Sequence, residues 1–309
     1  AGTLEIPTIP ASSAGPDLRE MIMGSEGRMG IITEVKMRVT PLPETESFHV
    51  MFFPSWRAGA DAAKALVQQK VQLSMVRLSN EMETMTLLLT GDTDALAELD
   101  SHLAANGIEG GRVMMTLGVT GAQRQCELAA GMARDICVGH GGVEADESFG
   151  KNWAHGRFSA PYLRDPLLQG GFVVDTMETA VDWGNVDSTL AAVEGAIREA
   201  GEAQGVQVHV YTHLSHVYSQ GSSIYTTYLF CSGEDYEATL ARWRRFKAAG
   251  ASAIVSCGGT ISHQHGVGAD HRDYIGAEKG PLGLAAIRQL CDFFDPDGRF
   301  NPGKLLPED

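Results

Sequence analysis

A loop near the end of the chain combines two histidines with four glycines. Residues 258–268 read GGTISHQHGVG, which places His263 and His265 two residues apart. Histidine titrates near neutral pH, so a loop of this kind is a candidate site for general acid and base chemistry. Surface histidines and zinc binding are the alternatives. No cysteine or carboxylate at suitable spacing offers a third ligand, so we expect no metal site.

Three further side chains could act on a substrate. Tyr225 lies in an alternating run typical of a strand, where tyrosines most often serve packing. Arg77 ends a predicted strand, and Arg164 lies in a predicted helix at 159–168. The planar guanidinium group binds carboxylate or phosphate, although a surface ion pair is the alternative for either arginine.

A glycine-rich turn, GSEGRMG at residues 24–30, precedes an alternating run at 31–39 that predicts a half-buried strand. Three glycines in seven residues let the backbone approach a ligand closely, and free amides can bind anionic oxygens. The turn is therefore either a ligand-contacting segment or a structural link to the strand.

The elements that must position these residues follow a repeated order. A strand–helix–strand–strand–helix pattern occurs twice, separated by a predicted helix at 121–138 and a glycine-rich loop at 139–160. The pattern predicts an α+β fold in which duplicated ferredoxin-like units form an antiparallel sheet with helices on one face. The predicted strands are 48–53, 71–77, 84–89, 172–179, 206–213 and 223–231, and the predicted helices are 56–69, 94–105, 186–203, 236–249 and 283–294.

Composition excludes several classes of function. The formal net charge of -15 disfavours nucleic acid, because such binding depends on Lys and Arg neutralising phosphates. Five cysteines without a CxxC pair indicate reduced thiols and a cytoplasmic location. No apolar run reaches the roughly 20 residues of a membrane-spanning helix. The chain opens at Ala1 without methionine, which indicates a trimmed methionine or a piece of a longer protein.

The motifs together resemble a known superfamily. GPDLREMIMGSEGRMGIITEVKMRVTPLPE resembles the end of the flavin-binding domain in FAD-linked oxidases of the vanillyl-alcohol-oxidase type. GGTISHQHGVG and FDPDGRFNPGKLLP resemble its C-terminal signature, and PYLRD, METAVDW and SSIY are similar to the alkylglycerone-phosphate synthases. The resemblance implies FAD as cofactor. It also implies an incomplete FAD-binding domain at 1–41, a substrate-binding cap at 42–265 and a segment returning to the FAD domain at 266–309.

The resemblance also assigns roles to residues. Tyr225 matches the catalytic tyrosine of the synthases, and His263 and His265 match two members of their three-histidine turn, with Gln264 in the middle position. Arg77 matches an arginine needed for activity, and Arg164 matches the arginine that holds the substrate phosphate. The matching FAD-contacting residues are Glu26, Gly27, Arg28, Met29, Gly30, Ile31 and Ile32.

The implied reaction exchanges the acyl group of acyl-dihydroxyacetone phosphate for a fatty alcohol, a use of flavin without net redox. The implied partners are a phosphate- or carboxylate-bearing small molecule, lipid included, the remainder of the FAD-binding domain, and a second copy in a homodimer. A peripheral membrane position and weak retention of FAD by this chain alone are further expectations.

Two alternatives remain open at this point. One is an FAD-dependent oxidoreductase acting on a 2-hydroxy acid or alcohol. Many of those enzymes place a histidine and a glutamate where this chain has Tyr225 and Gln264. The other is a ferredoxin-like interaction module without catalysis.

Overall fold

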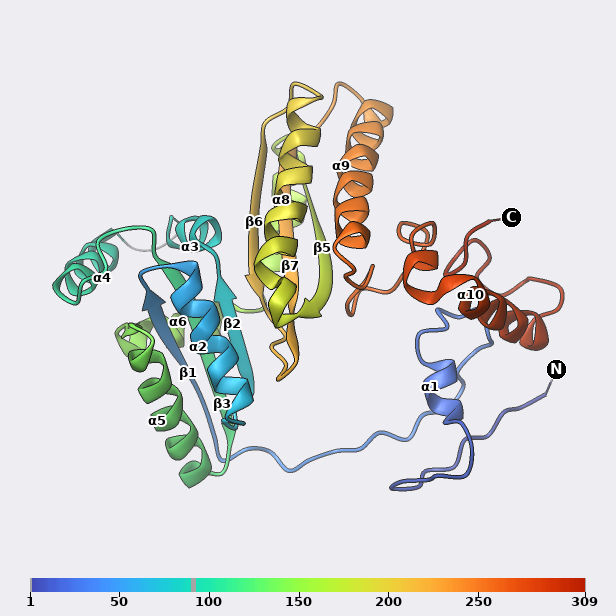
Figure 1. Cartoon of the computed structure of the whole chain (residues 1–309), viewed down its shortest axis with the longest axis horizontal. Helices are drawn as coiled ribbons and strands as arrows, with labels where there is room; N and C mark the ends of the chain where they lie inside the picture. The colour runs from blue at the N-terminus through green and yellow to red at the C-terminus, as the bar shows by residue number, and fades with distance from the viewer. Residues whose placement is uncertain (1, 90–92, 309) are drawn as a thin grey trace. The chain divides into compact units, whose positions relative to one another are not determined.

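The computed structural model describes residues 2–89 and 93–308. Contacts divide the chain into two compact units (Figure 1). We call residues 42–259 the cap unit, and residues 1–41 with 260–309 the terminal unit, and each is described by itself. Within the described residues, no helix has both the length and the apolar character needed to cross a membrane.

The cap unit is built on one seven-stranded sheet in which every strand pair is antiparallel, in the order β4-β1-β3-β2-β6-β7-β5. Its first half has the ferredoxin-like order 4-1-3-2, and β5, β6 and β7 of its second half repeat the 1-3-2 part of that order. The halves join side by side through β2 and β6. The predicted duplication is therefore confirmed. The strands are β1 (Thr45–Phe53), β2 (Met75–Ser79), β3 (Val113–Gly121), β4 (Val143–Glu144), β5 (Phe172–Asp182), β6 (Val208–Leu214) and β7 (Gly221–Cys231).

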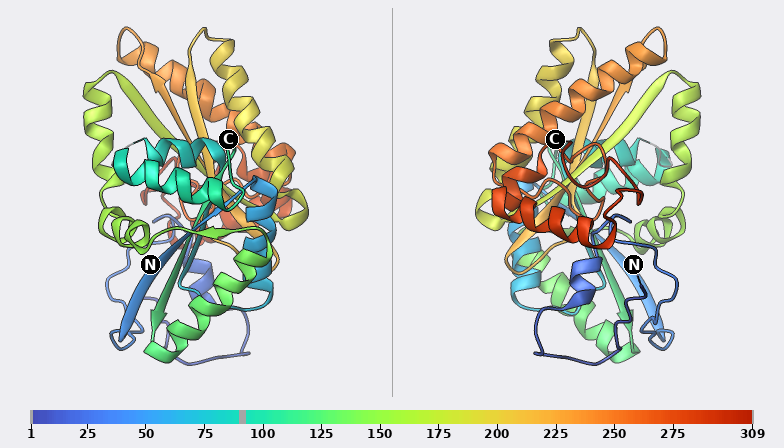
Figure 2. Two further views of the ribbon diagram at one scale, coloured as in Figure 1. Left: turned by 90° about the vertical axis from the view of Figure 1, so that its left-hand side faces the viewer. Right: turned by 90° about the vertical axis from the view of Figure 1, so that its right-hand side faces the viewer.

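Four helices cover one face of this sheet, two in each half (Figures 1 and 2). In the second half, Phe246 packs its ring against Tyr228 and Phe230, which places even-numbered residues of β7 on the helix side. Odd-numbered residues of β7 therefore face the other way, because side chains alternate along a strand. These helices are α2 (Trp56–Gln68), α5 (Gln123–Gly139), α8 (Val186–Glu202) and α9 (Tyr236–Ser256).

The first half differs from the sequence prediction in one element. The predicted strand 84–89 is wrong, because Asn80 caps a helix there: its side chain accepts a hydrogen bond from the backbone N–H of Glu83 at 2.9 Å. The strand that completes this half is β3, which the sequence reading missed. Inserted helices add a second small core on the opposite face, around Phe52, Met114 and Leu103. The additional helices of the cap unit are α3 (Glu81–Leu88), α4 (Thr93–Ala105), α6 (Glu147–Gly156), η1 (Ala160–Leu163), α7 (Arg164–Gln169) and η2 (Trp183–Asn185).

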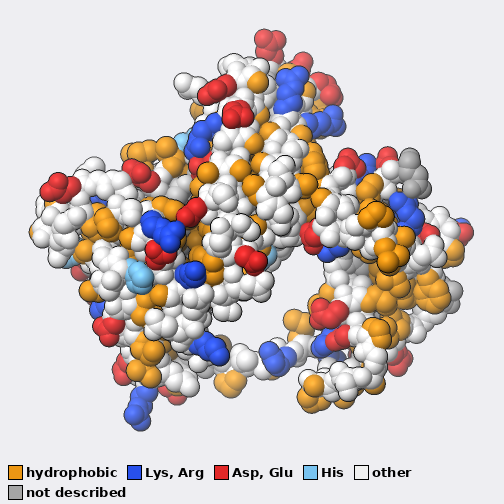
Figure 3. Space-filling view, in the orientation of Figure 1, with side chains coloured by type: hydrophobic (Ala, Val, Ile, Leu, Met, Phe, Trp, Pro, Cys, Tyr) orange, Lys and Arg blue, Asp and Glu red, His pale blue; other side chains and the backbone are white. Residues whose placement is uncertain are grey.

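The predicted strand 31–39 is also wrong within the described chain. The segment is extended but pairs with no described strand, and its apolar side chains are exposed, including Ile31 at 76% and Val39 at 85% (Figure 3). The alternation is present in the sequence. A strand, however, also needs a neighbour to hydrogen-bond, and the described residues supply none.

The terminal unit has its own core, in which Met29 packs with Ile275, Cys291 and the Leu305–Leu306 pair. Its helices are α1 (Leu18–Ile22) and α10 (Ile275–Phe294). Helix α10 is kinked where Gly280 has a φ of 65° and Pro281 follows. The predicted helix 283–294 is the part after this kink.

Candidate active site

Tyr225 lies on β7 at the centre of a polar patch. It pairs in register with His213 of β6 on one side and Glu178 of β5 on the other. Directly opposed residues share a sheet face, so all three lie on the face opposite α8 and α9, which we call the polar face. The His213 ring stacks on the Tyr225 ring, with centroids 4.7 Å apart and planes inclined by 16°.

A buried carboxylate joins this pair to Arg77. Oε1 of Glu83 lies 2.8 Å from Nη2 of Arg77 and 2.9 Å from Nδ1 of His213. Nη2 of Arg77 is itself 3.1 Å from that Nδ1. Arg77 shares the polar face because Ser79, two residues along β2, pairs with His213. Glu83 reaches the group from the first turn of α3, whose start is fixed by Asn80. We call Arg77, Glu83, His213 and Tyr225 the Tyr225 cluster.

Burial and charge set the ionisation of the cluster. Burial by itself raises the pKa of Glu83, but the contacts with His213 and Arg77 outweigh it and hold that pKa at about 2. Burial lowers the pKa of His213; the charge of Glu83 opposes this, and the charge of Arg77 adds to it. At neutral pH the cluster therefore contains one carboxylate, one guanidinium and a neutral imidazole.

The polar face continues along β6 next to the cluster. Tyr211 pairs in register with Thr227, and burial, with the nearby charge of Glu83, raises the pKa of Tyr211. His209 lies 2.9 Å from the hydroxyl of Thr86. Hydroxyl and imidazole groups thus line one face of β6, whereas Val210 and Leu214 on the other face are buried.

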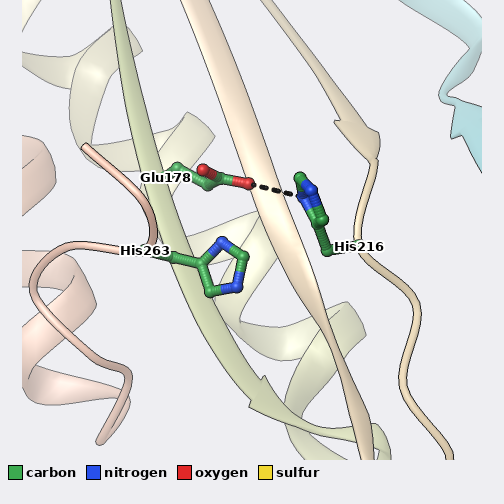
Figure 4. Close-up of side chains that lie close together, drawn as sticks. All are labelled: Glu178, His216 and His263. Carbon is green, nitrogen blue, oxygen red and sulfur yellow. Dashed lines mark ion pairs between the residues drawn. The ribbon is translucent and has the colours of Figure 1, made fainter. Parts of the chain in front are cut away.

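A second acid–imidazole pair lies beside Tyr225 within the cap unit. Nδ1 of His216 is 3.5 Å from Oε1 of Glu178, an ion pair drawn in Figure 4. Ser215 bridges the two, with its hydroxyl 3.2 Å from Glu178 and 3.1 Å from His216. The Ser223 hydroxyl accepts a hydrogen bond from the backbone N–H of His216 at 3.1 Å. The position of His216 is therefore fixed by contacts with β5, through Glu178, and with β7, through Ser223.

In the terminal unit the glycine-rich turn is fastened to the histidine loop by Glu26. Its carboxylate accepts the backbone N–H of Val267 and, at 2.7 Å, that of Gly268. The side-chain amide of Asn301 donates to the backbone carbonyl of Glu26 at 2.6 Å. Gln264, between the two histidines, has a φ of 62°, which a non-glycine residue adopts only where surrounding contacts hold it.

The structure gathers part of the predicted site. Arg77 and Tyr225 belong to one cluster, whereas Arg164 is exposed at the first position of α7. His263 is half-buried and His265 exposed, both in the terminal unit. The predicted cofactor-binding residues fall into two groups. The side chains of Glu26 and Arg28 hydrogen-bond to backbone of the terminal unit, with Arg28 donating to the carbonyl of Lys304 at 2.9 Å. Met29 is buried, and Gly30, Ile31 and Ile32 are not.

Sequence reasoning missed three members of the polar face, namely Glu83, His213 and Glu178. His213 could have been found, because it shares the alternation of Tyr211 on a predicted strand. Glu83 could not be placed while the stretch after it was read as a strand. Glu178 joins the site only through the register of β5 with β7, and that pairing is not visible in a single sequence.

Fold and site together define a class: α+β domains in which two ferredoxin-like halves share one sheet, with ionisable groups on the face opposite the four covering helices. A family model described as FAD linked oxidases, C-terminal domain, matches residues 42–305. The chain belongs to this family, whose cofactor is FAD, and the resemblance drawn from the motifs is confirmed.

Individual relatives agree with this placement. The chain is 27% identical to alkyldihydroxyacetonephosphate synthase of Dictyostelium discoideum, covering 99% of this chain and 51% of that protein. It is 25% identical to the mitochondrial D-lactate dehydrogenase (cytochrome) of Arabidopsis thaliana, covering 96% and 48%. A solved structure of alkyldihydroxyacetonephosphate synthase matches with a TM-score of 0.76 at 24% identity, covering 97% and 52%, which shows the shared fold. The chain thus spans about half the length of these relatives.

Proposed function

We propose that the protein is an FAD-dependent enzyme that exchanges the acyl group of acyl-dihydroxyacetone phosphate for a fatty alcohol. The observation that carries the proposal is the Tyr225 cluster, in which a tyrosine suggested by the synthase pattern sits on an imidazole held by a carboxylate and an arginine. The similarity to alkyldihydroxyacetonephosphate synthases over nearly the whole chain supports the same reaction.

The terminal unit offers residues that fit part of an FAD site. Gly24 and Gly30 have φ values of 82° and 136°, and a Cβ added at either would meet nothing within 4 Å, so a ligand can approach the backbone there. Because Glu26 is committed to the Val267–Gly268 backbone, we assign it a structural role. Gly30, Ile31 and Ile32 then form the part of the run that would contact FAD.

The exposed segment 31–39 supports a further part of the proposal. Its alternating apolar side chains lack a described partner, and they suit a strand that pairs with the rest of an FAD-binding domain. Such a domain, within the same protein, is the partner we propose for this segment.

Bound FAD would supply the electrophilic ring that the exchange of one oxygen substituent for another needs. The residues of this chain have separate tasks. Tyr225 would exchange a proton with the substrate, and the stacked, neutral His213 would hold its ring in place. The guanidinium of Arg77 would present positive charge at a fixed place in the site, while the carboxylate of Glu83 keeps the net charge of the pair at zero. Arg164, exposed on α7, is the cation we propose for the substrate phosphate.

Replacing the tyrosine tests this proposal. In the flavin-loaded protein, Tyr225→Phe should lower ether product formation by about 100-fold or more, the size of effect expected for a proton-transfer group, while flavin content and circular dichroism stay unchanged. Tyr236→Phe is the matched control, because Tyr236 is 73% exposed at the start of α9. Full activity in Tyr225→Phe would remove the tyrosine from the mechanism.

A second candidate is an FAD-dependent oxidoreductase acting on a 2-hydroxy acid. The Glu178–His216 pair favours it, because a carboxylate beside an imidazole can take the hydroxyl proton of such a substrate. The similarity to D-lactate dehydrogenase points the same way. Reduction of the bound flavin by D-lactate would support this candidate over the synthase.

A further inference from the structure

We propose that Glu83 is a positioning residue: it fixes the tautomer and orientation of His213, and through that ring it sets the place of Tyr225. The proposal rests on the proposed function, and it assigns a task to a residue that no motif indicated. It stands on two contacts of one carboxylate oxygen, one with Arg77 and one with His213, and on the stacking of the His213 and Tyr225 rings.

The tautomer follows from the hydrogen bonds. Glu83 is ionised and can only accept, so its 2.9 Å contact with Nδ1 of His213 is a hydrogen bond only when the proton is on Nδ1. Arg77, whose Nη2 lies 3.1 Å from the same Nδ1, could donate to it only in the other tautomer, and we assign the proton by the shorter contact with the carboxylate. Arg77 donates to the same carboxylate oxygen at 2.8 Å. In the neutral imidazole the Nε2 atom then carries the lone pair, and no described residue hydrogen-bonds that atom. The polar face thus presents a proton acceptor beside Tyr225.

The orientation follows from burial and backbone. Glu83 is 2% exposed and His213 is 5% exposed. Glu83 is anchored through its own backbone N–H to Asn80, so its carboxylate has little freedom to move. The imidazole ring is therefore clamped edge-on by the carboxylate and covered on one face by the Tyr225 ring. A loosened His213 ring would remove the surface on which the Tyr225 ring stacks.

The charge state follows from what surrounds His213. Arg77 of β2 and Glu83 of α3 contact its Nδ1, Tyr225 of β7 stacks on it, Tyr211 lies two residues along β6, and the charge of Glu178 on β5 also acts on it. Glu83 is its contacting anion. Removing that charge while keeping Arg77 makes protonation of His213 harder, so an activity that needs neutral His213 should extend to lower pH.

The test compares Glu83→Gln with Asp175→Asn. Asp175 is the control because it is also a carboxylate of the cap unit paired with a cation, the buried Lys247, but it is half-buried and lies on the helix side of the sheet. In the flavin-loaded protein, Glu83→Gln should lower kcat by about 10- to 100-fold and should change KM little. It should also move the acid limb of the pH profile of kcat to lower pH. Asp175→Asn should leave kcat and the acid limb unchanged.

Nitrogen NMR of the histidine rings reads the tautomer without catalysis. Wild-type His213 should carry its proton on Nδ1, and Glu83→Gln should give a mixture of tautomers and a lower pKa. A folded Glu83→Gln protein with wild-type kcat and acid limb, or wild-type His213 protonated on Nε2, would overturn the positioning role. If the wild type makes no ether product, the proposed function fails, and the NMR result alone then decides the role of Glu83.

Discussion

The ion pair between half-buried Asp175 and buried Lys247 gives the most quantitative prediction. Oδ2 of Asp175 accepts three hydrogen bonds: from Tyr228 Oη at 2.8 Å, from Trp243 Nε1 at 2.7 Å and from Lys247 Nζ at 3.0 Å. Lys247 is 8% exposed and keeps one other acceptor, the carbonyl of Thr176 at 3.0 Å. Burial raises the pKa of Asp175, but the charge and hydrogen bond of Lys247 outweigh this, so the net shift is downward.

Removing Asp175 alone should lower the unfolding free energy much more than removing Asp175 and Lys247 together. Asp175→Ala leaves the buried ammonium group of Lys247 without an anion, and leaving a buried charge uncompensated costs about 3–5 kcal/mol of unfolding free energy. Asp175→Ala combined with Lys247→Met removes the stranded charge, so the double variant should recover about 1–3 kcal/mol relative to additivity.

Urea unfolding of the four proteins, followed by circular dichroism, measures these free energies. The three variants and the wild type form a complete double-mutant cycle. If Asp175→Ala cost less than about 1 kcal/mol, a value typical of exposed pairs, or if the two substitutions were additive, the pair would not hold α9 to the sheet and the reasoning would be refuted.

Three further predictions concern other parts of the chain. The pKa of Glu83 in the folded protein is about 2, below the ordinary 4.5, so Glu83 should add about 3 kcal/mol of stability that is present above pH 4.5 and lost as the pH falls toward 2. Glu83→Gln should therefore make the unfolding free energy less dependent on pH across this range. The same pH dependence in Glu83→Gln and in the wild type would contradict this prediction. Gly150→Ala should destabilise by more than about 2 kcal/mol, because its Cβ would lie 1.9 Å from the Phe48 carbonyl oxygen. Gly131→Ala on α5 meets nothing within 4 Å and should stabilise by about 0.5–1 kcal/mol; thermal melts that rank the two equally would refute the packing. Glu26→Ala should speed amide hydrogen exchange at Val267 and Gly268, and unchanged protection would show that the carboxylate does not hold the turn.

The repeated strand and helix order was readable from the sequence because each half carries its own local signals. Alternation marked β1, β5 and β7, and amphipathic spacing marked α2 and α8. Helix α3 was misread because its apolar and β-branched residues fit a strand, and only the cap at Asn80 reveals the helix. The pattern of apolar residues therefore predicted the right element where the capping residue indicated the same element, and the wrong one in α3, where the cap at Asn80 indicated a helix.

The candidate site was predictable only in part, because a site depends on which strands become neighbours. Tyr225 and Arg77 were found from motifs, but the groups that join them, Glu83 and His213, depend on the pairing of β2 with β6. Two residues 130 positions apart share a hydrogen bond there. No local pattern encodes that register, and the same holds for Glu178 beside Tyr225.

The absorbance spectrum of the bound flavin under anaerobic conditions tests the synthase proposal most directly. When acyl-dihydroxyacetone phosphate and a fatty alcohol are added to the flavin-loaded protein, we expect ether product to accumulate while the flavin ends in its oxidised form. Lasting bleaching of the flavin by D-lactate or another 2-hydroxy acid, with no ether product from the lipid substrates, would contradict the account.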